Sequence, residues 1–352
     1  MNSICIYCHE QTKMSREHHL PECMGKFKDY AFLLEKVCEK CNGKFSPLEE
    51  QFCRCGPEAL FRIFLNIQGR RYHTKPSPFY RGSAGGKRIE IKAKHPDMIS
   101  EIYWELKPNT LTSMPARQII IQKSDGEIIP FIIHDNINSA EDIEAELGQA
   151  GIKEFQIIEF WCKQDEKELF NSLLSKFNYN PTFNKITPYQ DKDDILHEAT
   201  IVVTDRYFRA IAKIAFHYFL TYFSQFTGNE PNFNMIKNYI MEGGKGRNYV
   251  KEIRGTFIED LIFGGTTPTY NHFFSVEKDY HNIVAKLQFF VGPTISPQLY
   301  YEVFIGRNPE IIDYPQRIGH QFEYFDEPDA EGYEGRIVPM RPINKKLLPR
   351  IE

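Results

Sequence analysis

The chain has 352 residues, which is long enough for two domains with substantial hydrophobic cores. Its 43 Lys and Arg residues against 47 Asp and Glu residues give a net charge of -4, which excludes a polyanion-binding surface spread over the whole chain. Residues 1–7 lack the features of a secretory signal, and no later segment is apolar enough to span a bilayer, so we expect a cytoplasmic protein with no membrane partner.

The first part of the chain is rich in cysteine and histidine. Seven of the eight cysteines lie in the first 55 residues, and an apolar stretch at 59–67 is typical of a helix leading out. Ser46, Pro47 and Glu49 have the spacing of a capping box, which predicts a helix over residues 47–53.

A shift in composition marks a domain boundary. Glycine, proline, serine and basic residues dominate residues 69–86, as in loops and linkers. We therefore predict an N-terminal module over residues 1–68, a basic linker or DNA-contacting loop over residues 69–95, and a larger domain over residues 96–352, whose role the sequence leaves open.

The larger domain begins with strand patterns. Residues 118–122 and 128–133 predict a hairpin around Ser124-Asp125-Gly126, because two apolar runs flank a turn sequence. Further strands are predicted at 88–94, 102–106 and 155–161, and helices at 139–147 and 167–177.

The clearest helix covers residues 205–223, where apolar residues recur at three- and four-residue steps and predict one face toward the core. Arg206, Arg209 and Lys213 lie near one face, which is either a solvated outer face or a DNA contact. Strands are predicted at 257–263, 282–291 and 298–305, and the charged tail after residue 311 is predicted to be peripheral. The fold class is therefore α+β, with mainly antiparallel strands and a long amphipathic helix.

Two C-x-x-C pairs, Cys5 with Cys8 and Cys38 with Cys41, each offer two thiolates to a tetrahedral zinc ion. Redox chemistry would need one pair after a strand of a βαβ unit rather than two pairs around a short insert. The spacing therefore predicts a structural Zn²⁺ site. The other early cysteines lack a clear fourth partner and are expected to be thiols: Cys23, Cys53 and Cys55.

The insert between the pairs contains Glu17-His18-His19-Leu20-Pro21, and Asn42 follows the last cysteine. Phosphodiester hydrolysis needs a base to deprotonate water and a divalent ion held by hard ligands. His18 is the candidate base, and Glu17 and Asn42 are the candidate oxygen ligands of Mg²⁺ or Mn²⁺. Alternatively, His18 joins the zinc site or has a structural role, and His19 packs or supports the ligands.

This segment, from Cys5 to about Phe52, resembles the HNH endonucleases (ββα-metal or His-Me finger nucleases), in particular those held by two C-x-x-C knuckles. The resemblance rests on the knuckles, the acidic-His-x-x-Pro stretch from Glu17 to Pro21, Gly25 and Asn42. It implies that His18 activates water, that Glu17 binds the catalytic metal, and that Asn42 completes or braces the site. The module would then have the ββα-metal fold.

One family residue has no counterpart. The last histidine, expected a few residues after the asparagine, is missing, because Lys44, Phe45 and Ser46 follow Gly43. Glu49, Glu50 or water molecules are the candidates for this ligand, since Mg²⁺ commonly keeps several waters.

A basic patch with interleaved aromatic residues follows the module. Phosphate contacts from such a patch would bind nucleic acid with little sequence preference, and a solvated interdomain loop has the same composition. The candidate residues are Arg70, Arg71, Lys75, Arg81, Lys87 and Arg88.

These patterns predict a metal-dependent endonuclease acting on double-stranded DNA, with RNA as the alternative substrate. Analogy with nuclease domains that have such companions suggests a restriction or phage-defence system, and homo-oligomers are a further expectation. The competing hypothesis is a non-catalytic zinc module that binds nucleic acid or protein, which would have no need for the acidic-His-x-x-Pro element.

Overall fold

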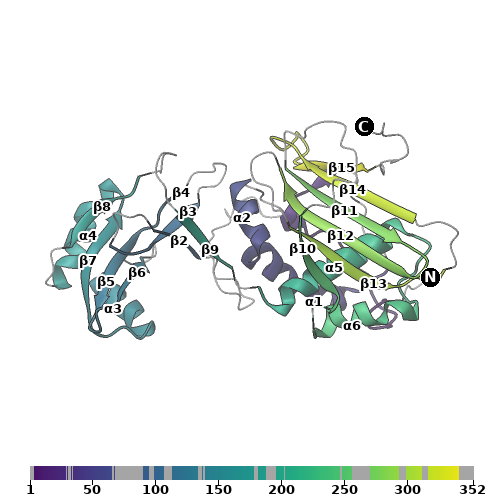
Figure 1. Cartoon of the computed structure of the whole chain (residues 1–352), viewed down its shortest axis with the longest axis horizontal. Helices are drawn as coiled ribbons and strands as arrows, with labels where there is room; N and C mark the ends of the chain where they lie inside the picture. The colour runs from purple at the N-terminus through teal and green to yellow at the C-terminus, as the bar shows by residue number, and fades with distance from the viewer. Residues whose placement is uncertain are drawn as a thin grey trace, which may run out of the picture.

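The computed structural model describes residues 4–28, 30, 33, 35–65, 67, 90–94, 99–106, 113–133, 137, 139–177, 181–187, 196–201, 203–245, 248–255, 270–292, 299–310 and 316–340. These residues form a mixed α+β structure with mostly antiparallel sheets (Figure 1). Every helix within these ranges is too short or too polar to cross a bilayer.

The largest element is a seven-stranded sheet with the order β1-β15-β14-β11-β12-β13-β10. All neighbours are antiparallel except β1, which runs parallel to β15 at one edge, with Phe27 opposite Gly335. The N-terminal part of the chain thus adds a strand to a sheet built by its last hundred residues. The strands are β1 (Phe27–Lys28), β10 (Val250–Arg254), β11 (Asn271–Lys278), β12 (Asn282–Val291), β13 (Leu299–Arg307), β14 (Gln316–Tyr324) and β15 (Gly335–Pro339).

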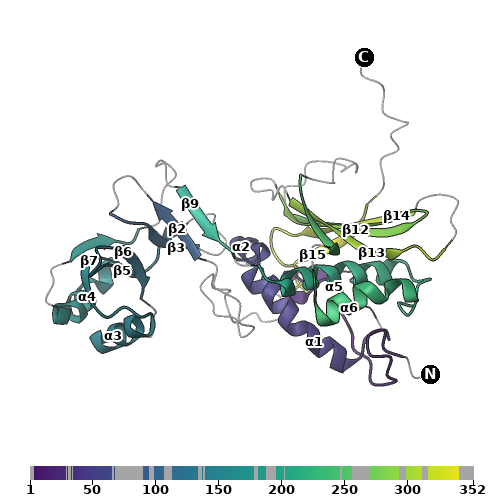
Figure 2. The same ribbon diagram turned by 60° about the horizontal axis from the view of Figure 1, so that its bottom comes forward.

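Three helices lie together on one face of this sheet. Figure 2 shows α5 (Asp205–Tyr222) and α6 (Asn234–Glu242) against the sheet, and α1 (Glu39–Glu50) packs on α5. One hydrophobic core joins residues of the N-terminal segment, such as Phe45 and Phe52, to residues of α5 and the sheet, such as Phe216 and Phe274. The cysteine-rich segment is therefore stabilised largely by packing on the last part of the chain.

The middle of the chain forms two four-stranded sheets, with the orders β4-β3-β2-β9 and β6-β5-β7-β8. The second sheet packs with α3 (Ala140–Gln149) and α4 (Lys167–Leu174) around a separate hydrophobic cluster. Figure 1 shows these elements on the far side of α2 (Pro57–Phe64) from the seven-stranded sheet. The strands are β2 (Glu90–Lys94), β3 (Ile102–Leu106), β4 (Ser113–Pro115), β5 (Gln118–Lys123), β6 (Ile128–Ile132), β7 (Phe155–Cys162), β8 (Thr182–Lys185) and β9 (Leu196–Thr200).

Several sequence predictions are confirmed. The hairpin of β5 and β6 is antiparallel around its turn, and Ser139 caps α3 in a capping box with Asp142. Strands β3, β7, β12 and β13 and helices α2, α4 and α5 also lie close to their predicted positions. The predicted strand at 257–263 and most of the predicted linker at 69–95 lie outside the described residues.

The capping box predicted at Ser46 was wrong. Helix α1 begins after Cys38, whose Sγ accepts a hydrogen bond from the backbone N–H of Cys41 (3.4 Å), and it continues through Pro47. Proline inside a helix removes one backbone hydrogen bond, yet Phe45 and Leu48 are buried in the core on either side of it. Tertiary packing therefore outweighs the helix-start signal of Ser46 and Pro47. A π-helical turn (Gln51–Cys55) follows α1.

The prediction of a peripheral tail after residue 311 was also wrong. Strands β14 and β15 lie inside the seven-stranded sheet, and Phe322 of β14 is fully buried. The charged residues of these strands, Arg317, Glu323 and Arg336, are partly or fully exposed, whereas the consecutive residues 319–322 of β14 are all buried.

Helix α5 is more deeply buried than the amphipathic pattern predicts. Of its 18 residues, 12 are buried, because α1 and α6 cover the sides that the sheet leaves open. Lys213 is fully buried, and Arg209 donates hydrogen bonds to the carbonyl of Ile240 at the end of α6. These two residues therefore hold the fold together rather than forming a solvated or DNA-binding face.

The buried histidines give a pH-dependent stability. Burial lowers the pKa of His217 to about 4, of His272 to about 3 and of His320 to about 4, against 6.5 for an exposed histidine. Between pH 6.5 and these lower pKa values, the three histidines bind protons in the unfolded chain but not in the folded chain. Stability is therefore complete above pH 6.5 and is lost as the pH falls toward 4.

Urea denaturation at a series of pH values should show this loss, with each histidine contributing up to about 1.4 kcal/mol per pH unit. His272→Gln should reduce the slope between pH 6.5 and 4, whereas the same change at the exposed His281 should leave it unaltered. A free energy of unfolding that is constant over this range would contradict the prediction.

Candidate functional site: a four-cysteine centre and the insert around His18

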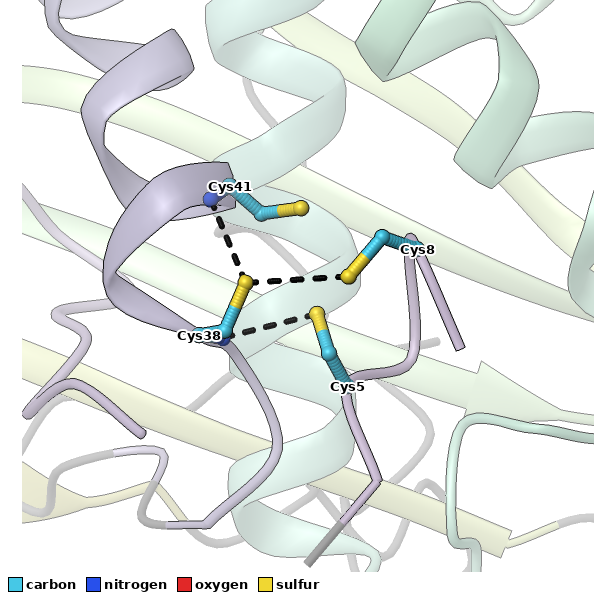
Figure 3. A group of neighbouring side chains, drawn as sticks. All are labelled: Cys5, Cys8, Cys38 and Cys41. Carbon is cyan, nitrogen blue, oxygen red and sulfur yellow. Dashed lines mark hydrogen bonds between the residues drawn. The ribbon is translucent and has the colours of Figure 1, made fainter. Parts of the chain in front are cut away.

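The four knuckle cysteines come together as predicted. Cys5 and Cys8 lie in an N-terminal turn, and Cys38 and Cys41 lie at the start of α1 (Figure 3). All four sulfur atoms lie within 4.8 Å of one another, and the sulfurs of Cys8 and Cys38 are 3.7 Å apart. A tetrahedron of zinc–sulfur bonds of about 2.3 Å places its sulfurs about 3.8 Å apart, so the cluster fits a structural zinc ion.

Backbone amides favour the thiolate form of Cys5. Cys5 Sγ accepts a hydrogen bond from the N–H of Cys38 (3.4 Å). Burial raises the pKa of Cys5, but backbone hydrogen bonds from Cys8, Cys38 and Tyr7 outweigh burial and bring it to about 7. Across the described ranges, no other group of three or more His, Cys, Asp or Glu side chains is arranged to hold a metal ion.

Lysines surround the centre. A pocket of about 260 Å³ borders Cys8 and Cys41 and is lined by Lys40, Lys44 and Lys237. Lys237 is 4% exposed. Because zinc with four thiolates has a net charge of -2, these ammonium groups offset the charge of the centre.

The insert between the knuckles forms a short antiparallel arrangement that leads into α1. Isolated bridges pair Met14 with Cys38 and Glu17 with Leu33. His18 follows this pairing directly, and its side chain is 27% exposed. His18, the candidate base, is thus accessible to solvent. It lies at the end of an antiparallel pairing that includes the knuckle residue Cys38.

Glu22 orients the ring of His18. The distance from His18 Nε2 to Glu22 Oε1 is 3.2 Å, and Tyr30 lies beside the ring with a centroid separation of 5.5 Å. Burial lowers the pKa of His18 below 6.5, although Glu22 opposes this change. The imidazole is therefore neutral at pH 7, as a proton acceptor must be. The sequence analysis did not identify Glu22, although its i, i+4 spacing from His18 was a usable signal.

Glu17 has a different environment from the one predicted. Its side chain is 2% exposed, and its carboxylate forms an ion pair with Lys213 and lies 3.4 Å from Nδ1 of His217. Burial raises the pKa of Glu17, but Lys213 and His217 lower it more strongly, to about 2. Both partners come from α5, nearly two hundred residues away in the sequence, and local spacing gives no signal for them.

Lys213 brings three oxygen atoms together around its ammonium group. Besides pairing with Glu17, it donates hydrogen bonds to Glu49 Oε1 and to the carbonyl oxygen of His18, each at 2.7 Å. Lys213 therefore links the insert that contains Glu17 and His18 to helix α1. With the ammonium group between the two carboxylates, the residues around Glu17 do not fit a divalent ion.

The other predicted site residues have separate positions. Asn42 is half-buried in the first turn of α1, and its N–H donates to the carbonyl of Cys38 (2.9 Å). In the part of the chain that the structure describes, its side chain makes no hydrogen bond. His19 is buried and stacks on Tyr30 with a centroid separation of 4.5 Å. Of the two helix glutamates, Glu49 contacts the cluster, whereas Glu50 pairs with Arg54 at 3.0 Å.

The remaining early cysteines differ partly from expectation. Cys23 and Cys53 form a disulfide with a Cα–Cα distance of 6.5 Å, so their prediction as thiols was wrong. The turn containing Cys23 packs on the π-helical turn containing Cys53, and this proximity is a tertiary contact that spacing does not reveal. Cys55 is a buried free thiol, as predicted.

All six residues of the predicted nucleic-acid patch, Arg70, Arg71, Lys75, Arg81, Lys87 and Arg88, lie outside the described residues. Searches among known protein families, curated proteins and solved structures found no match to this chain.

Proposed function

We propose that this chain is an HNH-type endonuclease that hydrolyses phosphodiester bonds of DNA with His18 as the general base. The observation that carries the proposal is the position of His18. Its partly exposed ring follows an antiparallel pairing and is oriented by Glu22, and its carbonyl oxygen is linked through Lys213 to Glu49 of helix α1. An antiparallel pairing that carries the histidine and is followed by a helix supports this proposal.

The chemistry assigned to His18 is removal of a proton from the attacking water. When Nε2–H donates to Glu22, the lone pair of the ring is on Nδ1, and the carboxylate stabilises the imidazolium that forms after proton transfer. Glu22 is thus a positioning residue. The backbone of His18 is held by Lys213 through its carbonyl oxygen, which limits movement of the base.

The zinc ion has a structural role in this proposal. Cys5, Cys8, Cys38 and Cys41 would hold the ion with four thiolates, which would leave no position for water or substrate. A catalytic Mg²⁺ or Mn²⁺ would supply charge stabilisation at the phosphate. Lys213 already pairs with Oε1 of Glu17 and with Oε1 of Glu49, so we assign no step to such an ion at Glu17, and we assign none at Asn42.

Supercoiled plasmid is the substrate that tests the proposal. The purified, zinc-loaded protein should convert it to nicked or linear DNA, and parallel reactions without and with Mg²⁺ or Mn²⁺ should show whether an added ion changes the rate. A single-stranded RNA of matched length tests the alternative substrate. Plasmid and RNA that stay intact under all of these conditions while the protein binds them would instead support a non-catalytic zinc module.

A further inference from the structure

The ammonium group of Lys213 lies at a point where oxygens from two separate segments converge. One carboxylate oxygen comes from Glu17 and the backbone oxygen from His18, both in the insert, and a second carboxylate oxygen comes from Glu49 on α1. An ammonium group has three N–H donors, and these three acceptors match them. Two carboxylates and a carbonyl are also the oxygen types that Mg²⁺ and Mn²⁺ prefer.

The electrostatic surroundings explain why a cation is needed there. Glu17 and Lys213 are almost completely buried, whereas the Glu49 side chain is 28% exposed. His217 lies 3.4 Å from Glu17 on its other side, and its Nε2 is 2.8 Å from the hydroxyl of Tyr7. With the Tyr7 hydroxyl donating to Nε2, the Nδ1–H of His217 faces Glu17, and the ring remains neutral. Lys213 is then the cation between the two carboxylates, and its single charge offsets one of theirs.

We propose that Lys213 is a built-in cation that takes the place of a divalent metal ion between Glu17 and Glu49. Removal of its ammonium group should convert the same oxygens into a binding site for Mg²⁺ or Mn²⁺. This inference extends the proposed function, because it assigns the charge beside His18 to a side chain instead of a bound ion. It does not depend on cleavage activity, since cation binding is measurable without DNA.

The substitution Lys213→Met tests the proposal, because methionine keeps an unbranched apolar side chain and removes the charge. The zinc-loaded variant should have a lower Tm than the wild type, because a buried carboxylate loses its partner. Added Mn²⁺ should raise the Tm of the variant by several degrees and leave the wild type nearly unchanged. Electron paramagnetic resonance should show one more tightly bound Mn²⁺ in the variant than in the wild type.

Two further variants separate this site from other cation sites. In the double variant Lys213→Met with Glu17→Gln, the extra bound Mn²⁺ should disappear. Lys278→Met is the matched control, because Lys278 is also buried and forms an ion pair with one carboxylate, that of Glu310. Its Tm should fall without any rescue by Mn²⁺.

Glu49→Gln in the wild-type background keeps the test decisive if Lys213→Met does not fold. Its Mn²⁺ response should equal that of the wild type, because the proposal leaves no divalent ion at Glu49. A wild-type Tm that rises with Mn²⁺ and loses this response in Glu49→Gln would overturn the proposal. So would a folded Lys213→Met protein that binds no additional Mn²⁺. Neither result would decide whether His18 promotes DNA cleavage.

Discussion

His18→Ala is expected to reduce plasmid cleavage by about 10²–10⁴-fold, the usual contribution of a general base. The side chain is partly exposed and outside the main core, so the loss should occur without unfolding. Zinc content, circular dichroism and Tm should therefore remain close to those of the wild type. The measurement is the initial rate of supercoiled plasmid loss under single-turnover conditions.

Matched variants make the loss specific to the base. His281→Ala changes an exposed histidine in the turn between β11 and β12 and should retain full activity. Glu22→Gln keeps the imidazole but replaces the charge that orients it, so a smaller loss is expected. Unchanged cleavage by His18→Ala would remove this residue as the base, whatever the zinc site does.

Cys38→Ser is expected to unfold the N-terminal segment. It removes a zinc ligand and also the Sγ acceptor that caps α1. Structural zinc contributes about 10–16 kcal/mol of apparent binding free energy in small zinc modules, which is comparable to the whole stability of a domain. We expect loss of bound zinc by metal analysis, a lower Tm and rapid proteolysis between residues 4 and 67.

Cys162→Ala provides the control for cysteine loss. Cys162 is buried in the separate cluster formed by β5, β7 and α4, away from the knuckles. This variant should bind one zinc per chain as the wild type does. A soluble Cys38→Ser protein with wild-type Tm and proteolytic resistance would show that the four sulfurs do not need a metal to hold the fold.

The sequence allowed prediction of the features that depend on short spacing. Two C-x-x-C pairs predicted the sulfur cluster, and a turn sequence between two apolar runs predicted the β5–β6 hairpin. Periodicity predicted α5, because local geometry determines which side chains share a face. The contact between His18 and Glu22, which are four residues apart, could have been predicted from spacing in the same way. Such features need no knowledge of tertiary packing.

The features that the sequence could not show depend on contacts between distant residues. Lys213 looked like part of a polar helix face, and only packing of α5 between α1 and the sheet brings its ammonium group to Glu17. Pro47 looked like a helix start because its burial partners were unknown. In both cases, a local rule was overridden by burial against segments far away in the sequence.

The pairing of β1 with β15 has a consequence for synthesis of the protein. Residues 26–28 find their sheet partners only at residues 334–336, and the core around the knuckles includes residues of α5 and β14. On the ribosome, the knuckles emerge well before α5 and β14, so their apolar neighbours have no cover until those elements have been synthesised. The N-terminal segment should therefore reach its final packing only after β14 and β15 have been made, although it is synthesised long before them.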